Sequence, residues 1–471
     1  MSHSYDVAVV GGGPGGYVAA IRAAQYGLST VLFEGEALGG TCLNWGCIPT
    51  KAMLHTTDVL HEIRQAGSIG IDLGGAQAKP DIDALYAYKD KAVKKLTKGV
   101  GSLLKGAGVE VIRATAELSD AHTLRAADDP EKTVTARNII LALGSRVVVP
   151  PIPGLAEAGY WTSRSVLSDN PALPESLVII GGGVIGVEFA NIYNELGVKV
   201  TVVEMMDQLL PLMDAELAET LKRELTKAGI TVETGVKVTE VSGTSPKRVQ
   251  VTDADGARTL EAAEIMVAVG RTARIEMPGL EAAGVRVTER GIPVGDTQQT
   301  SVPHIYAIGD VTGRWQLAHA ASAEGVAAVD HIAGKPNYAD RNIVPSCVYT
   351  RPEVAAVGMT EKQAQEAGYR TAVGTFPLAA NSKAQIMGEG AGFAKIVSDE
   401  ATGAVLGAHL TGPRSTELIA EIAVAMTAEA TVEEVSATIH PHPTVSEAIM
   451  ESFHDIEGLS VHKPPQKRRT G

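Results

Sequence analysis

Cysteine is scarce in this sequence, with three residues among 471. Three cysteines are too few for a disulfide-stabilised secreted scaffold, and they indicate a reducing compartment. In such a compartment a disulfide is more often catalytic than structural. We therefore expect a cytoplasmic protein in which any disulfide takes part in chemistry.

Long hydrophobic runs and an excess of positive charge are also missing. No run reaches the about 18 apolar residues that a membrane span needs. No basic segment followed by an apolar stretch precedes the first strand-like run at Val7, so no secretory signal is expected. The formal net charge is −14, which makes nucleic acid a poor candidate partner. We interpret the short basic run at residues 467–469 as a solvated chain end.

Glycine, in contrast, is abundant, with 50 residues. Many glycines follow strand-like runs and no Gly/Ser-rich tract occurs, so they indicate tight turns and nucleotide loops rather than a flexible linker. Hydrophobic residues make up 45% of the chain and the mean hydropathy is +0.07, which is typical of folded proteins. The length corresponds to about three domains.

A pattern of strand, glycine turn, helix and strand occurs twice. The first copy runs from Val7 through the turn at 11–16 and ends at Glu34. The second runs from Leu177 through the turn at 181–186 and ends at Glu204. Such glycines permit close approach of a pyrophosphate, the helix N-terminus favours its charge, and the carboxylate can bind a ribose diol. The alternative is two βαβ units whose glycines serve only helix–strand packing.

Two such turns in one chain indicate an electron relay between two bound dinucleotides. Glu204 would repel a 2′-phosphate, and the residues that follow it, 205–208, include no Arg or Lys to bind one. The second site is therefore predicted to take NAD rather than NADP.

Two of the cysteines, Cys42 and Cys47, lie in the segment 39–51, shortly after the first turn. A helical pattern begins near Ile48, so the helix dipole would favour the thiolate of Cys47, and Lys51 adds a nearby cation. The pair could store two electrons as a dithiol and release them as a disulfide. Zinc is a poor alternative because no second Cys or His pair has ligand spacing. Both cysteines could also be small buried hydrophobes, which is how we interpret Cys347.

A second candidate site lies near the other end, at residues 440–447, where His440 and His442 precede Glu447. A histidine can take the proton of an attacking thiol, and a carboxylate can orient the imidazole. Two histidines between prolines could alternatively form a rigid surface turn.

The segments 39–51, 181–188, 307–310 and 440–447 resemble the pyridine nucleotide–disulfide oxidoreductase family, and the resemblance covers essentially the whole chain. The cysteine segment is highly specific, while the glycine turns are much less so. The resemblance implies an α/β fold with two Rossmann-like domains and a C-terminal α+β dimerisation domain. The implied domains are 1–148 (FAD), 149–277 (NAD), 278–341 (completing the FAD site) and 342–471 (interface).

The resemblance also assigns roles to residues of this sequence. Cys42 is the outer thiol that meets the substrate, Cys47 the thiol beside the flavin, His442 the base and Glu447 its orienter; Lys51 and Glu188 form a pair beside the flavin. The implied FAD ligands are Gly11, Gly13, Gly16, Glu34, Thr41, Lys51, Gly144, Ser145, Asp310, Leu317, Ala318 and His319. The implied NAD ligands are Gly181, Gly183, Gly186, Glu188, Glu204 and Gly270. No metal is implied.

The activity implied by the resemblance is the oxidation of protein-bound dihydrolipoamide by NAD⁺ through FAD. Implied partners are a second copy of the chain, whose base reaches the cysteines of the first, and the lipoyl domains of 2-oxo acid dehydrogenase complexes or of glycine cleavage. A glutathione-type or mercuric reductase is the main alternative, but Glu204 argues against NADPH and no cysteine follows Cys347. A binding protein that kept the fold without turnover is a further alternative.

One segment departs from the family pattern. Residues 270–274 read Gly-Arg-Thr-Ala-Arg, where the family more usually has Gly-Arg followed by a Pro-Asn pair. We expect this difference to reshape a loop near the nicotinamide domain without touching a proposed catalytic group.

Overall fold

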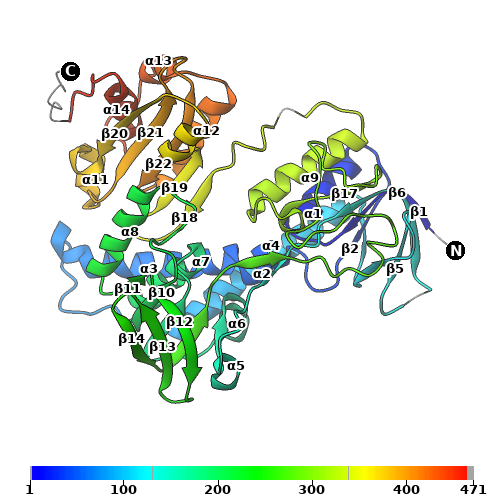
Figure 1. Cartoon of the computed structure of the whole chain (residues 1–471), viewed down its shortest axis with the longest axis horizontal. Coiled ribbons are helices and arrows are strands. Elements are labelled where there is room, and N and C mark those ends of the chain that lie inside the picture. Colours follow the sequence, from blue (N-terminus) through cyan, green and yellow to red (C-terminus); the bar gives the residue numbers. More distant parts are fainter. Residues whose placement is uncertain (1–2, 130, 338, 464–471) are drawn as a thin grey trace. The chain divides into compact units, whose positions relative to one another are not determined.

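The computed structural model describes residues 3–129, 131–337 and 339–463 (Figure 1). The basic run at 467–469 lies outside these residues. The chain divides into two compact units, which are described separately below. Unit 1 comprises residues 1–150, 161–172 and 269–341, and unit 2 comprises residues 151–160, 173–268 and 342–471.

Unit 1 is built on a sheet with the strand order β3-β2-β1-β6-β5-β4, and β17 also pairs with β6. The strands are β1 (His3–Val10), β2 (Thr30–Phe33), β3 (Glu110–Ile112), β4 (Ala116–Leu118), β5 (Thr123–Ala126), β6 (Thr133–Leu141) and β17 (Ile305–Ala307). Strands β3, β2, β1, β6 and β17 run parallel. Because both faces of β1 are covered, Val7 and Val9 enter one hydrophobic core and Ala8 and Val10 the opposite one.

The helices of unit 1 that matter for the site are α1 (Pro14–Gln25), α2 (Gly40–Trp45), α3 (Cys47–Gln65), α4 (Ile82–Gly106), α6 (Ser163–Asp169) and α9 (Ala318–Ile332). Small residues let α1 and α9 approach closely. A Cβ on Gly325 would come within 2.7 Å of the Gly15 carbonyl oxygen. A short antiparallel pair of strands that are distant in the sequence, β7 (Ser145–Val147) and β16 (Arg271–Ala273), completes this unit beside the predicted flavin ligands.

Unit 2 contains the second copy of the repeat. Four parallel strands are ordered β11-β10-β9-β15: β9 (Ser176–Ile180), β10 (Lys199–Glu204), β11 (Thr231–Thr234) and β15 (Glu264–Val267). Helix α7 (Val184–Glu195) follows the glycine turn, and α8 (Ala215–Lys227) follows β10. An antiparallel sheet is formed by β12 (Lys237–Ser242), β13 (Lys247–Asp253) and β14 (Gly256–Ala262).

The C-terminal part of unit 2 is an antiparallel sheet with the order β18-β19-β22-β21-β20. Its strands are β18 (Ser346–Val348), β19 (Val354–Gly358), β20 (Thr371–Pro377), β21 (Phe393–Asp399) and β22 (Val405–Thr411). Helices α12 (Ser415–Thr427) and α14 (Glu447–Ile456) pack their apolar residues onto one face of this sheet (Figure 1). Lys395 on β21 pairs with Asp214 (3.1 Å) and Glu216 (2.7 Å) at the start of α8.

The predicted α/β class with a C-terminal α+β part is confirmed. The four domain boundaries stay a prediction. Among the described residues, no helix is both long and apolar enough to cross a membrane.

Candidate active site

The first glycine turn joins β1 to α1 and is closed by hydrogen bonds to Glu34. The backbone N–H of Gly12 donates to Oε2 of Glu34 (2.7 Å), and the N–H groups of Glu36 and Ala37 donate to Oε1 (2.7 and 3.0 Å). Gly11 has a φ of +101°, a backbone conformation that a residue with a side chain would adopt only with strain. A Cβ on Gly16 would lie 1.8 Å from the Gly11 carbonyl oxygen, so this position accepts only glycine.

The second turn repeats this geometry in unit 2. The N–H of Gly182 donates to Oε2 of Glu204 (2.6 Å), and the N–H of Met206 donates to Oε1 (2.7 Å). A Cβ on Gly186 would lie 1.9 Å from the Gly181 carbonyl oxygen. Glu204 is 8% exposed, and its buried carboxylate would repel the 2′-phosphate of an NADP molecule bound at this turn.

Both turns have room for a dinucleotide. A Cβ on Gly183 would meet no atom within 4 Å, and one on Gly13 would meet only the Cα of Gly40, at 3.9 Å. Helices α1 and α7 begin directly after these two glycines, so the first backbone N–H groups of each helix have no acceptor within the helix. A helix N-terminus with a nearby carboxylate fits the pyrophosphate and ribose of a dinucleotide.

Cys42 and Cys47 lie on two consecutive helices, α2 and α3, separated by Gly46. The two sulfurs are not bonded to each other. A hydrogen bond with Cys47 raises the pKa of the Cys42 thiol, and burial adds to this effect, whereas Lys51 opposes it. Cys47 is the first residue of α3, where the helix dipole favours a thiolate. The raised pKa favours the protonated form of Cys42, whereas the position of Cys47 at a helix N-terminus is one that favours a thiolate.

Arg271 connects several predicted flavin ligands in unit 1. Its Nε donates to Oγ of Ser145 (2.8 Å), and its Nη2 donates to the Ser145 carbonyl (2.9 Å) and to Oγ1 of Thr41 (3.4 Å). Oγ of Ser145 in turn donates to Asp310. Burial lowers the pKa of the Arg271 guanidinium, while the charges of Asp310 and Cys47 oppose this.

Asp310 lies just after β17, in the short 3-10 helix Gly309–Thr312. Burial raises the pKa of its carboxyl group, and the hydrogen bond from Ser145 counteracts part of that rise. The preceding N–H, of Gly309, donates to Oε2 of Glu324 (2.6 Å), which is 2% exposed on α9. Leu317 is the N-cap of α9, and Ala318 and His319 form its first turn.

His442 and Glu447 are paired in unit 2. Nδ1 of His442 lies 2.9 Å from Oε1 of Glu447, and the backbone N–H of Thr444 donates to Oε2 (2.8 Å). Burial alone would raise the pKa of Glu447, but the hydrogen bonds from Thr444 and His442 outweigh it and lower the pKa. The His442 side chain is 70% exposed, whereas that of His440 is 4% exposed and bonded to Glu421 (2.7 Å). Of these two histidines, His442 is the one whose second ring nitrogen is open to a substrate.

Comparison with known proteins places this set of residues in a family. Residues 5–325 match the pyridine nucleotide-disulphide oxidoreductase family, and residues 344–453 match its dimerisation domain. This chain belongs to the pyridine nucleotide-disulphide oxidoreductases. The predicted family and the oxidoreductase class are confirmed, and FAD and NAD are the cofactors of this family.

Relatives of the oxidoreductase match it over nearly the whole length. It is 43% identical to a dihydrolipoyl dehydrogenase of Rhizobium etli, with 97% of this chain and 99% of the relative covered. It is 41% identical to a dihydrolipoyl dehydrogenase of Bacillus subtilis, with 98% and 100% covered. A solved structure, the HOCl-induced flavoprotein disulfide reductase RclA from Escherichia coli, has a TM-score of 0.84 at 30% identity, with 95% and 99% covered.

The remaining predicted site residues of the oxidoreductase are divided between the units. Unit 1 holds Lys51 on α3, Gly144, whose carbonyl accepts from the Arg274 N–H (3.0 Å), and Gly270, whose carbonyl accepts from the Val148 N–H (3.0 Å). Unit 2 holds Glu188 on α7, 3% exposed, which accepts from the Tyr349 N–H (3.1 Å).

Two residues of the oxidoreductase site do not follow from the sequence pattern. The segment 270–274 is expected to touch no proposed catalytic group, and this expectation stays a prediction. Arg271 contacts Thr41 and Ser145, which are predicted flavin ligands. Glu324 was not among the predicted site residues. Its only signal was an acidic residue in the middle of an Ala-rich helix, because a carboxylate that is buried there needs a partner.

Proposed function

We propose that this protein is a dihydrolipoyl dehydrogenase, which oxidises protein-bound dihydrolipoyl groups and reduces NAD⁺ to NADH. The similarity to curated dihydrolipoyl dehydrogenases over 97–98% of the chain carries this proposal. The paired thiols of Cys42 and Cys47 and the His442–Glu447 pair supply the groups that the reaction needs. We further propose that it acts in the cytoplasm.

The chemistry begins with the Cys42–Cys47 disulfide. His442 takes the proton of one substrate thiol, and the resulting thiolate attacks Cys42, so that Cys47 leaves as a thiolate. The second substrate thiol then attacks the substrate sulfur of this mixed disulfide and displaces Cys42. In this second transfer His442 gives its proton to the departing Cys42 sulfur and takes up the proton of the second substrate thiol. The substrate leaves as a cyclic disulfide and the enzyme holds a dithiol, so two electrons have moved to the enzyme. Glu447 holds the His442 ring during both proton transfers.

The residues of the first turn, together with Thr41, Lys51, Ser145, Asp310 and the start of α9, would hold FAD. When bound, FAD relays the electron pair between the enzyme sulfurs and the nicotinamide. The second turn and Glu204 would hold NAD. The buried Glu204 carboxylate disfavours a 2′-phosphate, which supports NAD over NADP.

The dimerisation domain at residues 344–453 supports a homodimer. We propose that His442 of one subunit serves the cysteine pair of the other, and that lipoyl domains of 2-oxo acid dehydrogenase complexes or of glycine cleavage are the partners.

Steady-state assays test the proposal directly. We expect turnover with dihydrolipoamide and NAD⁺, and little with glutathione disulfide and NADPH. The His442→Gln variant should lose about 10²- to 10⁴-fold in kcat, the usual contribution of a general base.

A disulfide reductase of the kind named for the Escherichia coli structure is the second candidate, favoured by its TM-score of 0.84. Full dihydrolipoamide turnover by a Cys47→Ser variant would contradict the proposed mechanism.

A further inference from the structure

Helix α4 carries an unusual charge distribution for this acidic protein. Residues 91–106 contain five lysines, at positions 91, 94, 95, 98 and 105, and no acidic residue. At 100° per residue these lysines fall within an arc of about 100° on the helix surface. All five are exposed, and no ion pair to any of them is found within the described ranges. The face is therefore a concentrated and uncompensated positive surface.

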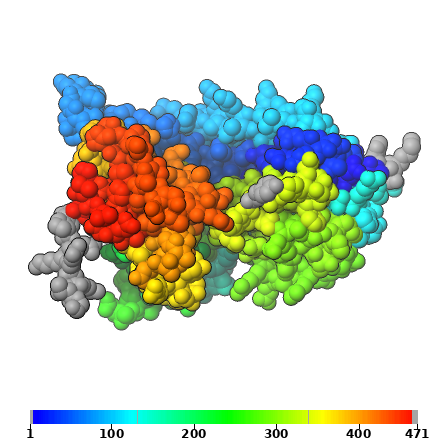
Figure 2. Space-filling view, turned by 90° about the horizontal axis from the view of Figure 1, so that it is seen from above, coloured from blue at the N-terminus to red at the C-terminus, as the bar shows by residue number. Residues whose placement is uncertain are grey.

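The opposite face of α4 packs against α2, the helix that carries Cys42. Val100 and Leu104 of α4 share a hydrophobic core with Leu43 of α2, and Cys42 is partly buried against the same core. Between the two faces, Leu96 and Leu103 are 41% and 60% exposed. The lysine face thus lies on the outer side of the helix that supports the substrate-facing cysteine. Figure 2 shows lighter-blue residues, the part of the sequence that includes α4, exposed on the surface in that view.

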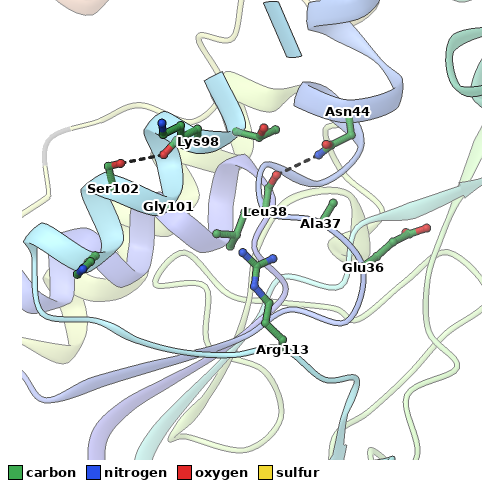
Figure 3. Close-up of a pocket in the computed structure, with 10 residues that line it drawn as sticks. Glu36, Ala37, Leu38, Asn44, Lys98, Gly101, Ser102 and Arg113 are labelled. Atoms are coloured by element: carbon green, nitrogen blue, oxygen red, sulfur yellow. Dashed lines mark hydrogen bonds between the residues drawn. The ribbon is translucent and has the colours of Figure 1, made fainter. Parts of the chain in front are cut away.

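A pocket of about 540 Å³ adjoins this face, and Lys98, Lys105 and Arg113 contribute to its lining. In Figure 3, Lys98 and Ser102 border it from α4, and Ala37, Leu38 and Asn44 border it from the segment that leads to the cysteines. The one carboxylate of its lining, Glu36, is already paired with Arg164. The three cations of the pocket are left available to an acidic side chain from outside.

We propose that the lysine face of α4 and its pocket dock an acidic carrier domain, which brings a protein-borne dihydrolipoyl group to Cys42. This inference rests on the proposed function. A chain with a net charge of −14 repels acidic partners over most of its surface, so a local positive face selects where they approach. The exposed Leu96 and Leu103 supply apolar contact beside the charges, as is usual in protein interfaces.

Charge reversal on α4 tests the docking surface. The variant Lys94→Glu/Lys98→Glu changes two exposed lysines one turn apart, and Lys199→Glu/Lys237→Glu makes the same charge change at exposed positions of unit 2. Each holoenzyme is assayed with free dihydrolipoamide and with a purified acidic dihydrolipoyl domain. For the α4 variant we expect about a tenfold loss of kcat/KM with the domain at low salt, and an unchanged value with free dihydrolipoamide.

The size of the loss should fall as ionic strength rises past about 0.15 M, where the screening length is about 8 Å. The control variant should retain wild-type kcat/KM with both substrates. An α4 variant that loses both activities equally, or neither, would overturn the docking proposal and leave the proposed function standing. A wild-type enzyme inactive with free dihydrolipoamide would overturn the proposed function and, with it, the docking proposal. Thermal unfolding of both variants checks that they are folded, and Lys94→Gln/Lys98→Gln should give an intermediate loss.

Discussion

Cys42 and Cys47 are chemically identical thiols in different local surroundings. Cys47 begins a 19-residue helix, α3, whereas Cys42 is held on the short helix before it. The largest influence on the Cys42 pKa is its hydrogen bond with Cys47. These surroundings agree with the proposed roles of Cys42 as the attacked sulfur and Cys47 as the leaving sulfur.

Removal of Cys47 should lower the pKa of Cys42. In Cys47→Ala, both the hydrogen-bond partner and the nearby negative charge disappear, while the favourable charge of Lys51 remains. Because the raised pKa keeps Cys42 protonated, its fall should move the midpoint of Cys42 alkylation to lower pH. The rate of iodoacetamide labelling of the reduced protein across pH measures this shift. The Cys347→Ala variant is the matched control, and an unmoved midpoint in Cys47→Ala would contradict the assignment.

Arg271 is predicted to be needed for flavin retention. In Arg271→Met, Ser145 and Thr41 lose charge-assisted hydrogen bonds of about 1.5–3 kcal/mol, which corresponds to roughly 10- to 150-fold weaker FAD binding. Fluorescence titration of the flavin-free protein with FAD measures the dissociation constant. The exposed Arg274, three residues later, provides the control variant Arg274→Met. Equal affinities in the two variants would show that Arg271 has no positioning role.

The sequence could locate single residues where they recur at a fixed spacing, while their roles as ligands stay predictions. Glu34 and Glu204 each end the second strand of a repeat, and each accepts hydrogen bonds from its own glycine turn. Arg271 could not be found this way, because its partners Ser145 and Thr41 are 126 and 230 residues distant in the chain. These contacts depend on the pairing of β7 with β16, two strands from distant parts of the chain, and no local sequence pattern encodes that pairing.

At the scale of elements, the two glycine turns show how closely helix and strand must approach. Gly186→Ala should destabilise unit 2, because the new Cβ would lie 1.9 Å from the Gly181 carbonyl oxygen. Overpacking of this kind costs about 1–3 kcal/mol, which thermal unfolding detects. Gly183→Ala should fold normally, since its Cβ meets nothing within 4 Å, yet it should raise the KM for NAD⁺ by obstructing the pyrophosphate. The same KM and unfolding temperature in both variants would refute this distinction.

The elements themselves were largely predictable. The strands, glycine turns and helices of both repeats follow from the apolar runs and from the glycines that interrupt them. Helix α3 begins at Cys47, next to the predicted start near Ile48. Helix α2 was not predicted. Gly39 and Gly46 flank its six residues, and Gly40 is the first of them. Because glycine is unfavourable in helices, we attribute the stability of this helix to the tertiary packing of Leu43.

At the scale of the whole molecule, the proposed sharing of the site between subunits predicts complementation. His442→Gln and Cys42→Ser proteins should each be nearly inactive alone. If both are dissociated, mixed and reassociated, about half of the dimers are hybrids, and each hybrid has one intact site. We expect recovery of about a quarter of wild-type activity. No recovery, with hybrids verified by differently tagged subunits, would place the base and the cysteines within one subunit.

The hydrogen bonds from the glycine turns to Glu34 and Glu204 have a further consequence. Each carboxylate is held by a backbone N–H of its own turn, at 2.7 Å for Glu34 and 2.6 Å for Glu204. The chain itself therefore sets the shape of each turn, and little conformational entropy is lost when a dinucleotide binds. We expect each dinucleotide to bind a preorganised turn, so that the contacts of the dinucleotide, and not the ordering of the turn, determine the affinity.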